Sequence, residues 1–178
     1  MKSPHHRRSI RLPGYDYSQP GAYFVTICTR TRECVLGEAV EGEVRLNEAG
    51  RVVSDTWNWL GRQYPYVEPD EWVIMPNHLH AIVIIHANPA DEPSRGGSRT
   101  APTLPRRKPL GRLIGALKTV SAKRINELRG TPGAAVWQRN DYEHVLRHEE
   151  DLRRIRESIA QNPLAWEHDE ENPGRVSQ

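Results

Sequence analysis

Two histidines separated by one residue are the groups in this 178-residue sequence whose spacing most suggests chemistry. His78 and His80 flank Leu79 and directly precede the apolar run at residues 81–85. Because side chains alternate along a β-strand, both imidazoles would lie on one face while Leu79 points into a core. Two imidazoles in this arrangement can hold one divalent cation. The spacing therefore makes the two histidines a candidate metal site. The alternative interpretation is that they are surface histidines without a ligand.

Basic residues gather in two stretches of the chain. Residues 1–32 hold six basic and one acidic side chain, and residues 93–129 hold ten basic and one acidic. The stretch between them, residues 33–92, is strongly acidic. Clustered basic side chains neutralise phosphates and release counterions, so the pattern favours a nucleic-acid partner over plain solvated surfaces. The residues expected to contact phosphates are Arg7, Arg8, Arg106, Arg107, Lys108 and Arg112.

Several classes of protein are excluded by composition. The longest apolar run is about five residues, which is too short to span a membrane. The N-terminus is polar and basic, without the apolar stretch of a secretory signal. Cys28 and Cys34 form neither a disulfide framework nor a Cys-x-x-Cys metal motif. We therefore expect a cytoplasmic protein without membrane contact.

The elements that must position the histidines follow from apolar spacing and turn residues. In chain order they are a strand at 22–28, a hairpin at 35–46, a helix at 47–62, strands at 66–75 and 78–85, a helix at 110–129, extended segments at 136–139 and 142–147, and a helix at 149–161. The strand that begins with His78 pairs with its predecessor through a tight turn at Pro76-Asn77. This order predicts an α+β fold, an antiparallel sheet with helices packed on one face.

Five segments, in the same order and spacing, resemble the single-tyrosine transposases and in particular the REP-associated subfamily. The histidine pair lies in Trp72-Val-Ile-Met-Pro-Asn-His-Leu-His-Ala-Ile-Val83, which resembles the His-hydrophobic-His segment of that family. The other matching segments are Gly21–Thr26, Leu110–Lys118, Trp137–Arg147 and Ile159–Pro163. The resemblance covers about residues 15–167, and several motifs in one order are more specific than any single motif.

The resemblance implies a ferredoxin-like fold and a DNA transposase. It implies Mg²⁺ or Mn²⁺ held by His78 and His80, with Asn162 at the position of a third polar ligand. The implied partner is single-stranded or hairpin DNA of the REP type, and the protein would act as a monomer or homodimer. A tyrosine on the last helix would attack the scissile phosphate, form a 5′-phosphotyrosine bond and release a 3′-hydroxyl.

We expect the chain to divide into three parts. A basic N-terminal arm covers residues 1–20, and a transposase-like catalytic domain covers residues 21–166. Within that domain, residues 87–109 are rich in Pro and Gly and are expected to form a flexible loop. An acidic tail without a packing signal covers residues 167–178.

The sequence departs from the family at the nucleophile. The position of the expected tyrosine is occupied by Ser158, four residues before Asn162. Three explanations stay open: Ser158 is a weaker nucleophile, Tyr142 acts in its place, or the protein has lost cleavage and only binds DNA. The alternative functions are a non-catalytic nucleic-acid-binding protein of ferredoxin-like fold and a metal-dependent nuclease that uses water.

Overall fold

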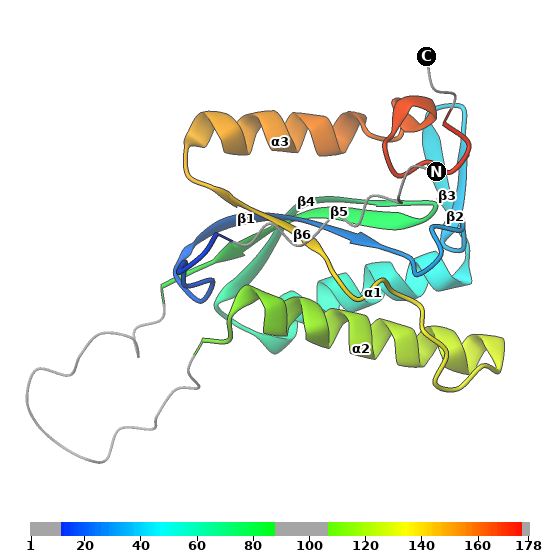
Figure 1. Cartoon of the computed structure of the whole chain (residues 1–178), viewed down its shortest axis with the longest axis horizontal. Helices are drawn as coiled ribbons and strands as arrows, with labels where there is room; N and C mark the ends of the chain where they lie inside the picture. Colours follow the sequence, from blue (N-terminus) through cyan, green and yellow to red (C-terminus); the bar gives the residue numbers. More distant parts are fainter. Residues whose placement is uncertain (1–11, 88–106, 176–178) are drawn as a thin grey trace, which may run out of the picture.

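The protein, seen in a computed structural model, is described for residues 12–87 and 107–175 (Figure 1). The strands are β1 (Gly21–Cys28), β2 (Gly37–Val40), β3 (Glu43–Leu46), β4 (Val67–Met75), β5 (His78–Ile85) and β6 (Tyr142–Leu146). The helices are α1 (Glu48–Gln63), α2 (Leu110–Arg129) and α3 (Glu149–Gln161), followed by a 3₁₀ turn, η2 (Trp166–His168). None of the described helices is long and apolar enough to cross a membrane.

The central sheet has four antiparallel strands in the order β4-β5-β1-β6. Together with α1 and α2 these strands follow the βαββαβ order of a ferredoxin-like fold. The β2–β3 hairpin is inserted between β1 and α1, and α3 follows the last strand. The predicted α+β fold class is confirmed, and β5, the strand with the histidines, is an interior strand.

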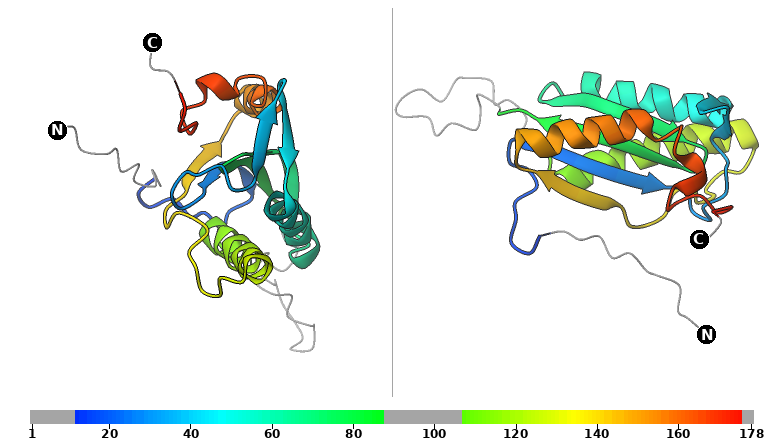
Figure 2. Two further views of the ribbon diagram at one scale, coloured as in Figure 1. Left: turned by 90° about the vertical axis from the view of Figure 1, so that its right-hand side faces the viewer. Right: turned by 90° about the horizontal axis from the view of Figure 1, so that it is seen from above.

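Helices α1 and α2 form one layer against the sheet, as predicted (Figures 1 and 2). Alternate residues of β1, among them Tyr23, Val25 and Ile27, point into this layer and are completely buried. Trp57 of α1 and Leu117 of α2 pack against them. Most of the apolar side chains that drive folding are buried on this face.

Helix α3 lies across the opposite face of the sheet (Figure 2, left). Its apolar residues recur every three or four positions, so Leu152, Ile155 and Ile159 form one stripe. This stripe packs on Ile82 of β5 and Leu146 of β6 in a second, smaller core. The last helix is therefore placed over the same face as the even-numbered residues of β5.

Local sequence signals explain where the helices begin and end. The Asn47 side chain accepts a hydrogen bond from the Gly50 backbone N–H at 3.0 Å and caps α1, as expected for an N-cap asparagine. Gly130 ends α2 with a φ of +63°, a left-handed conformation that glycine adopts without a Cβ penalty. Helix α3 ends at Gln161, and Asn162, its C-cap directly before Pro163, still has a helical conformation with φ −58° and ψ −39°.

The segment after α3 folds back onto the sheet. Residues 167–175 were expected to form an acidic tail without packing, but Glu171 is only 4% exposed. Its backbone carbonyl accepts a hydrogen bond of 2.7 Å from the Asn77 amide, at the turn between β4 and β5. The ring of Trp166 lies 6.1 Å from that of His78. These contacts bring two acidic residues of the segment to the histidine pair.

Candidate metal centre

His78 and His80 lie side by side on one face of the sheet, as their spacing predicts, and this is the face that carries α3. Their ring centroids are 4.3 Å apart, and Leu79 between them is fully buried in the core on the other face. Ile82 continues the same row of β5 and contacts the α3 stripe. Alternation along an interior strand therefore directs both imidazoles toward α3 and the segment that follows it.

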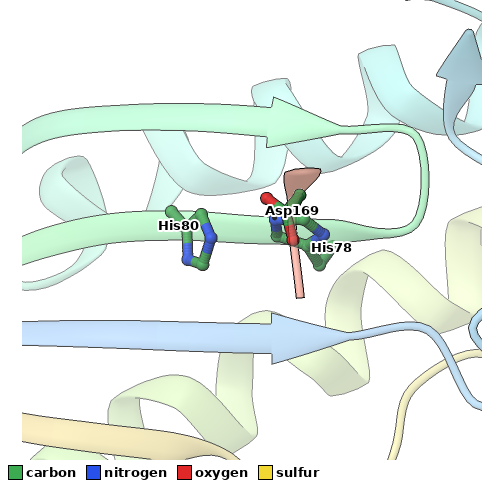
Figure 3. Close-up of side chains that lie close together, drawn as sticks. All are labelled: His78, His80 and Asp169. Carbon is green, nitrogen blue, oxygen red and sulfur yellow. Dashed lines mark ion pairs between the residues drawn. The ribbon is translucent and has the colours of Figure 1, made fainter. Parts of the chain in front are cut away.

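Asp169 completes a cluster of three potential metal ligands (Figure 3). One nitrogen from each histidine and one carboxylate oxygen of Asp169 all lie within 4.8 Å of one another. The carboxylate comes from the folded-back segment, whereas the histidines come from β5. Imidazole nitrogens with a carboxylate oxygen form a donor set that suits Mn²⁺ and related divalent ions.

The hydrogen bonds of Asn77 determine which nitrogen of His78 is available. The Asn77 Nδ2 donates to the backbone carbonyls of Arg32 and Glu171, at 2.8 and 2.7 Å. Its Oδ1 must then accept the 2.8 Å bond from His78 Nδ1, which therefore carries the proton. His78 Nε2 keeps its lone pair, is buried, and makes no hydrogen bond within the described residues. That lone pair faces Asp169 Oδ2 at 3.7 Å.

His80 is positioned from the neighbouring strand. Its Nδ1 lies 2.8 Å from the hydroxyl oxygen of Thr26, the residue directly opposite on β1. Phe24 of the same strand stacks on the His80 ring, with centroids 5.5 Å apart. A hydrogen bond at one ring nitrogen orients a metal-binding imidazole and presents the other nitrogen to the ion.

The pKa of His78 is lowered to about 2, mainly because burial penalises the charged imidazolium and further because His80 and Arg32 are nearby positive groups. The neutral imidazole is therefore the form present at neutral pH. A neutral imidazole is the form that binds metals. The environment of His78 thus prepares a ligand rather than a general acid.

Acid should destabilise the metal-free protein through His78. A histidine in the unfolded chain titrates near 6.5, whereas the folded pKa is about 2. Between these values the unfolded chain binds a proton that the folded chain does not, so stability falls as pH drops below about 6.5, by about 1 kcal/mol per pH unit. Urea midpoints measured at pH 7 and 5 should therefore differ more in the wild type than in His78→Gln. Equal differences in the two proteins would contradict this assignment.

Asn162 contacts the cluster through Asp169. The Asn162 Nδ2 donates to Asp169 Oδ2 at 3.0 Å, and the backbone N–H of Glu171 donates to Asp169 Oδ1 at 2.7 Å. The other amide atom, Asn162 Oδ1, is buried without a hydrogen bond to any described residue. Two buried acceptors, this oxygen and His78 Nε2, thus border one carboxylate. The donor set fits a divalent cation, with Asp169 nearest the histidines.

The two candidate nucleophiles lie on different elements. Ser158 is exposed on α3, one helical turn before Asn162. Tyr142 is half-buried at the start of β6, where it pairs with Thr26. Since Thr26 also pairs with His80, these three side chains form one row across β6, β1 and β5, on the α3 face. Tyr142 therefore shares a sheet face with the histidine pair.

Of the basic residues expected to contact phosphates, those that the structure describes are not brought to the histidines. Arg7, Arg8 and Arg106 lie outside the described residues. Arg107 donates to the backbone carbonyl of His86 at 3.3 Å, at the far end of β5 from His78. Lys108 packs over the ring of Tyr64, and Arg112 is exposed in the first turn of α2. Phosphates contacted by Arg107, Lys108 or Arg112 would therefore lie away from the candidate metal centre.

Three residues of the centre were missed in the sequence. Asp169 and Glu171 fell within a segment assigned to an acidic tail, and Asn77 was taken only as a turn residue. One signal was present directly before this segment, since Trp166 is a large aromatic residue that a chain leaving the domain into water has little reason to carry. Its ring packs near His78 and begins the turn that positions Asp169.

The fold is that of the REP-associated tyrosine transposases. A solved structure described as a REP-associated tyrosine transposase bound to a REP hairpin matches with a TM-score of 0.58 and 19% sequence identity. The match covers 94% of this chain and 76% of that chain. At this identity the similarity establishes the fold.

The chain belongs to the same family as an uncharacterized protein of Haemophilus influenzae. The two are 37% identical, and the matched region covers 93% of each protein. No family model matches the chain.

Proposed function

We propose that the protein is a transposase-like DNA-binding protein that cleaves single-stranded or hairpin DNA with a divalent metal, Mg²⁺ or Mn²⁺. The observation that carries the proposal is the cluster that His78 and His80, on an interior strand of this fold, form with Asp169 of the segment after α3. The solved neighbour with the same fold is bound to a REP hairpin, which supports a hairpin DNA as the partner.

The residues at the centre would have different roles in cleavage. A divalent ion held by His78, His80 and Asp169 would supply positive charge to a scissile phosphate. Asn77 holds His78 in the tautomer that presents Nε2, and Thr26 orients His80. A hydroxyl of Ser158 or Tyr142 attacks phosphorus, the bond to the 3′ oxygen breaks, and the proton of that hydroxyl ends on the released 3′-hydroxyl. The DNA 5′ end is then esterified to the protein.

A second function deserves a test because of Ser158. A serine side chain is shorter than tyrosine by a whole ring, and Ser158 is exposed on α3. A protein that keeps the metal ligands but lacks an effective nucleophile would bind nucleic acid without forming a covalent bond. A nuclease that uses water would instead cleave without an adduct.

Incubation of purified protein with end-labelled hairpin DNA and Mn²⁺ distinguishes the three functions. Denaturing gels should show a labelled protein band if a side chain is the nucleophile, and cleaved DNA without such a band if water is. DNA that is retained in native gels but stays intact in denaturing gels would indicate a binding protein. DNA that is neither retained in native gels nor cleaved or bound covalently in denaturing gels would refute the proposed function.

The two basic stretches should make DNA binding depend on salt. If about five phosphates are contacted, log K falls with log salt at a slope of about −3.5 for single strands. Replacement of Arg106, Arg107 and Lys108 by alanine should weaken binding and flatten the slope by about 2. Fluorescence anisotropy with a labelled oligonucleotide at several salt concentrations measures both quantities.

The matched control for this triple variant removes three basic residues from the acidic stretch. Arg45, Arg51 and Arg62 are the only basic residues between positions 33 and 92, so their replacement changes the net charge equally. The slope of this control should stay close to that of the wild type. If both triple variants behave alike, residues 106–108 act only through net charge.

A further inference from the structure

The buried carboxylate of Glu171 forms an ion pair with Arg32 directly beside the candidate metal centre. The Arg32 Nη2 lies 3.1 Å from Glu171 Oε2, and the carboxylate side chain is 5% exposed whereas the arginine is 41% exposed. Glu171 also positions Asp169 through its backbone N–H. An anion is therefore held against a partly exposed guanidinium, next to the residues that would hold a metal.

The backbone of Arg32 is held in an uncommon conformation. Its φ of +60° lies in the left-handed region, which residues with a Cβ adopt only at a cost. Asn77 stabilises this turn by donating to the Arg32 carbonyl at 2.8 Å. The same amide group binds the Glu171 carbonyl, and its oxygen binds His78. One buried asparagine thus ties the arginine, the carboxylate and a metal ligand together.

A small hollow opens between this ion pair and Tyr142. Its volume is about 30 Å³, enough for one or two water molecules and too small for a phosphate group. Thr26, Gln138 and Asn140 contribute neutral polar side chains to its wall. The other acidic residue of the wall, Asp141, is paired with Lys118 of α2. With Glu171 moved away, the wall would offer an arginine and several neutral donors to an anion.

We propose that Arg32 binds a phosphate group of the DNA backbone, and that Glu171 occupies this place until DNA displaces it and so enlarges the hollow. The inference rests on the proposed function and adds a phosphate-binding residue and a competing carboxylate to it. Carboxylate and phosphate both match the planar fork of a guanidinium, so one can replace the other. A phosphate there would lie beside Tyr142, in the row of side chains that leads through Thr26 to His80.

Replacement of Glu171 tests the competition. Glu171→Gln should raise the affinity for a labelled single-stranded oligonucleotide about 10-fold, measured by anisotropy in EDTA so that metal binding does not contribute. Asp55→Asn is the matched control, because Asp55 pairs with Arg124 between α1 and α2, on the other side of the sheet. That control removes the same charge and should change affinity by less than about 2-fold. Equal gains in both variants would overturn the inference.

Replacement of Arg32 tests the phosphate contact. Arg32→Ala should lower the affinity about 10-fold, whereas Arg124→Ala should have little effect. In the Glu171→Gln background the ion pair is already broken, so an arginine that only holds the segment would have no further role. We expect Arg32→Ala to cost about 10-fold in that background as well. No further loss in the double variant would overturn the inference.

Further controls show whether a change in affinity comes from unfolding of the variant, and whether a failed test refutes the proposed function or this inference alone. Circular dichroism melts should show that each variant is folded, and Glu171→Asp, which keeps the charge but shortens its reach, should raise affinity if Glu171→Gln unfolds. Absence of DNA binding in the wild type and every variant would refute the proposed function together with this inference. DNA affinity that is the same in the wild type and in the Glu171 and Arg32 variants would refute this inference alone.

Discussion

Replacing His80 by alanine should lower Mn²⁺ affinity by about 100-fold or more and reduce DNA cleavage to background. His80 supplies one of only two imidazoles to the cluster, and it is half-buried, so its loss opens no large cavity in the core. Isothermal titration with Mn²⁺ measures the first effect, and labelled DNA measures the second. The matched control is His148→Ala, because His148 is exposed before α3 and should leave both quantities unchanged.

Two further variants identify the third ligand. Asp169→Asn should lower Mn²⁺ affinity nearly as much as His80→Ala if the carboxylate binds the ion directly. Asn162→Ala should have a smaller effect, about 10-fold, if the amide acts through its hydrogen bond to Asp169. The reverse order would make Asn162 the ligand, as the family resemblance implies, and Asp169 its support. Unchanged metal affinity in His80→Ala and Asp169→Asn would refute the metal centre.

Replacing Ser158 by tyrosine should raise metal-dependent cleavage by about 100-fold and yield a covalent protein–DNA adduct. The serine oxygen lies a whole ring short of the position that a tyrosine hydroxyl would reach, and a misplacement of about 1 Å costs about 100-fold in rate. The phenol is also the better leaving group when a 3′-hydroxyl reverses the bond. Denaturing gels with labelled hairpin DNA measure the adduct, and alkali distinguishes a phosphotyrosine from a phosphoserine ester.

Tyr142 provides the internal control for this experiment. In the Ser158→Tyr protein, Tyr142→Phe should leave adduct formation nearly intact, because the new phenol replaces any role of Tyr142. The opposite result is an inert Ser158→Tyr protein and a wild type whose adduct disappears in Tyr142→Phe. It would identify Tyr142 as the nucleophile and would agree with its place in the row that contains Thr26 and His80.

The regular elements of this protein were predictable because their signals are local. Apolar residues at helical spacing gave α2 its limits at Leu110 and Arg129, and the α3 limits were predicted equally well. The alternation around Leu79 placed both histidines on one face of a strand. Each of these signals depends on neighbours within one or two turns or strand repeats, which a sequence displays directly.

The acidic ligand Asp169, the ion pair of Glu171 with Arg32 and the face covered by α3 were decided only by the tertiary structure. Asn77 and Glu171 are 94 residues apart in the chain and meet through one hydrogen bond. An acidic segment normally stays in water, since burial of a carboxylate is costly unless charges and hydrogen bonds compensate it. Here Arg32 compensates the Glu171 carboxylate and Asn162 the Asp169 carboxylate, while Asn77 binds the backbone of the segment. These groups come together only when the sheet forms. Local patterns therefore determined the histidine pair, whereas long-range packing determined what surrounds it.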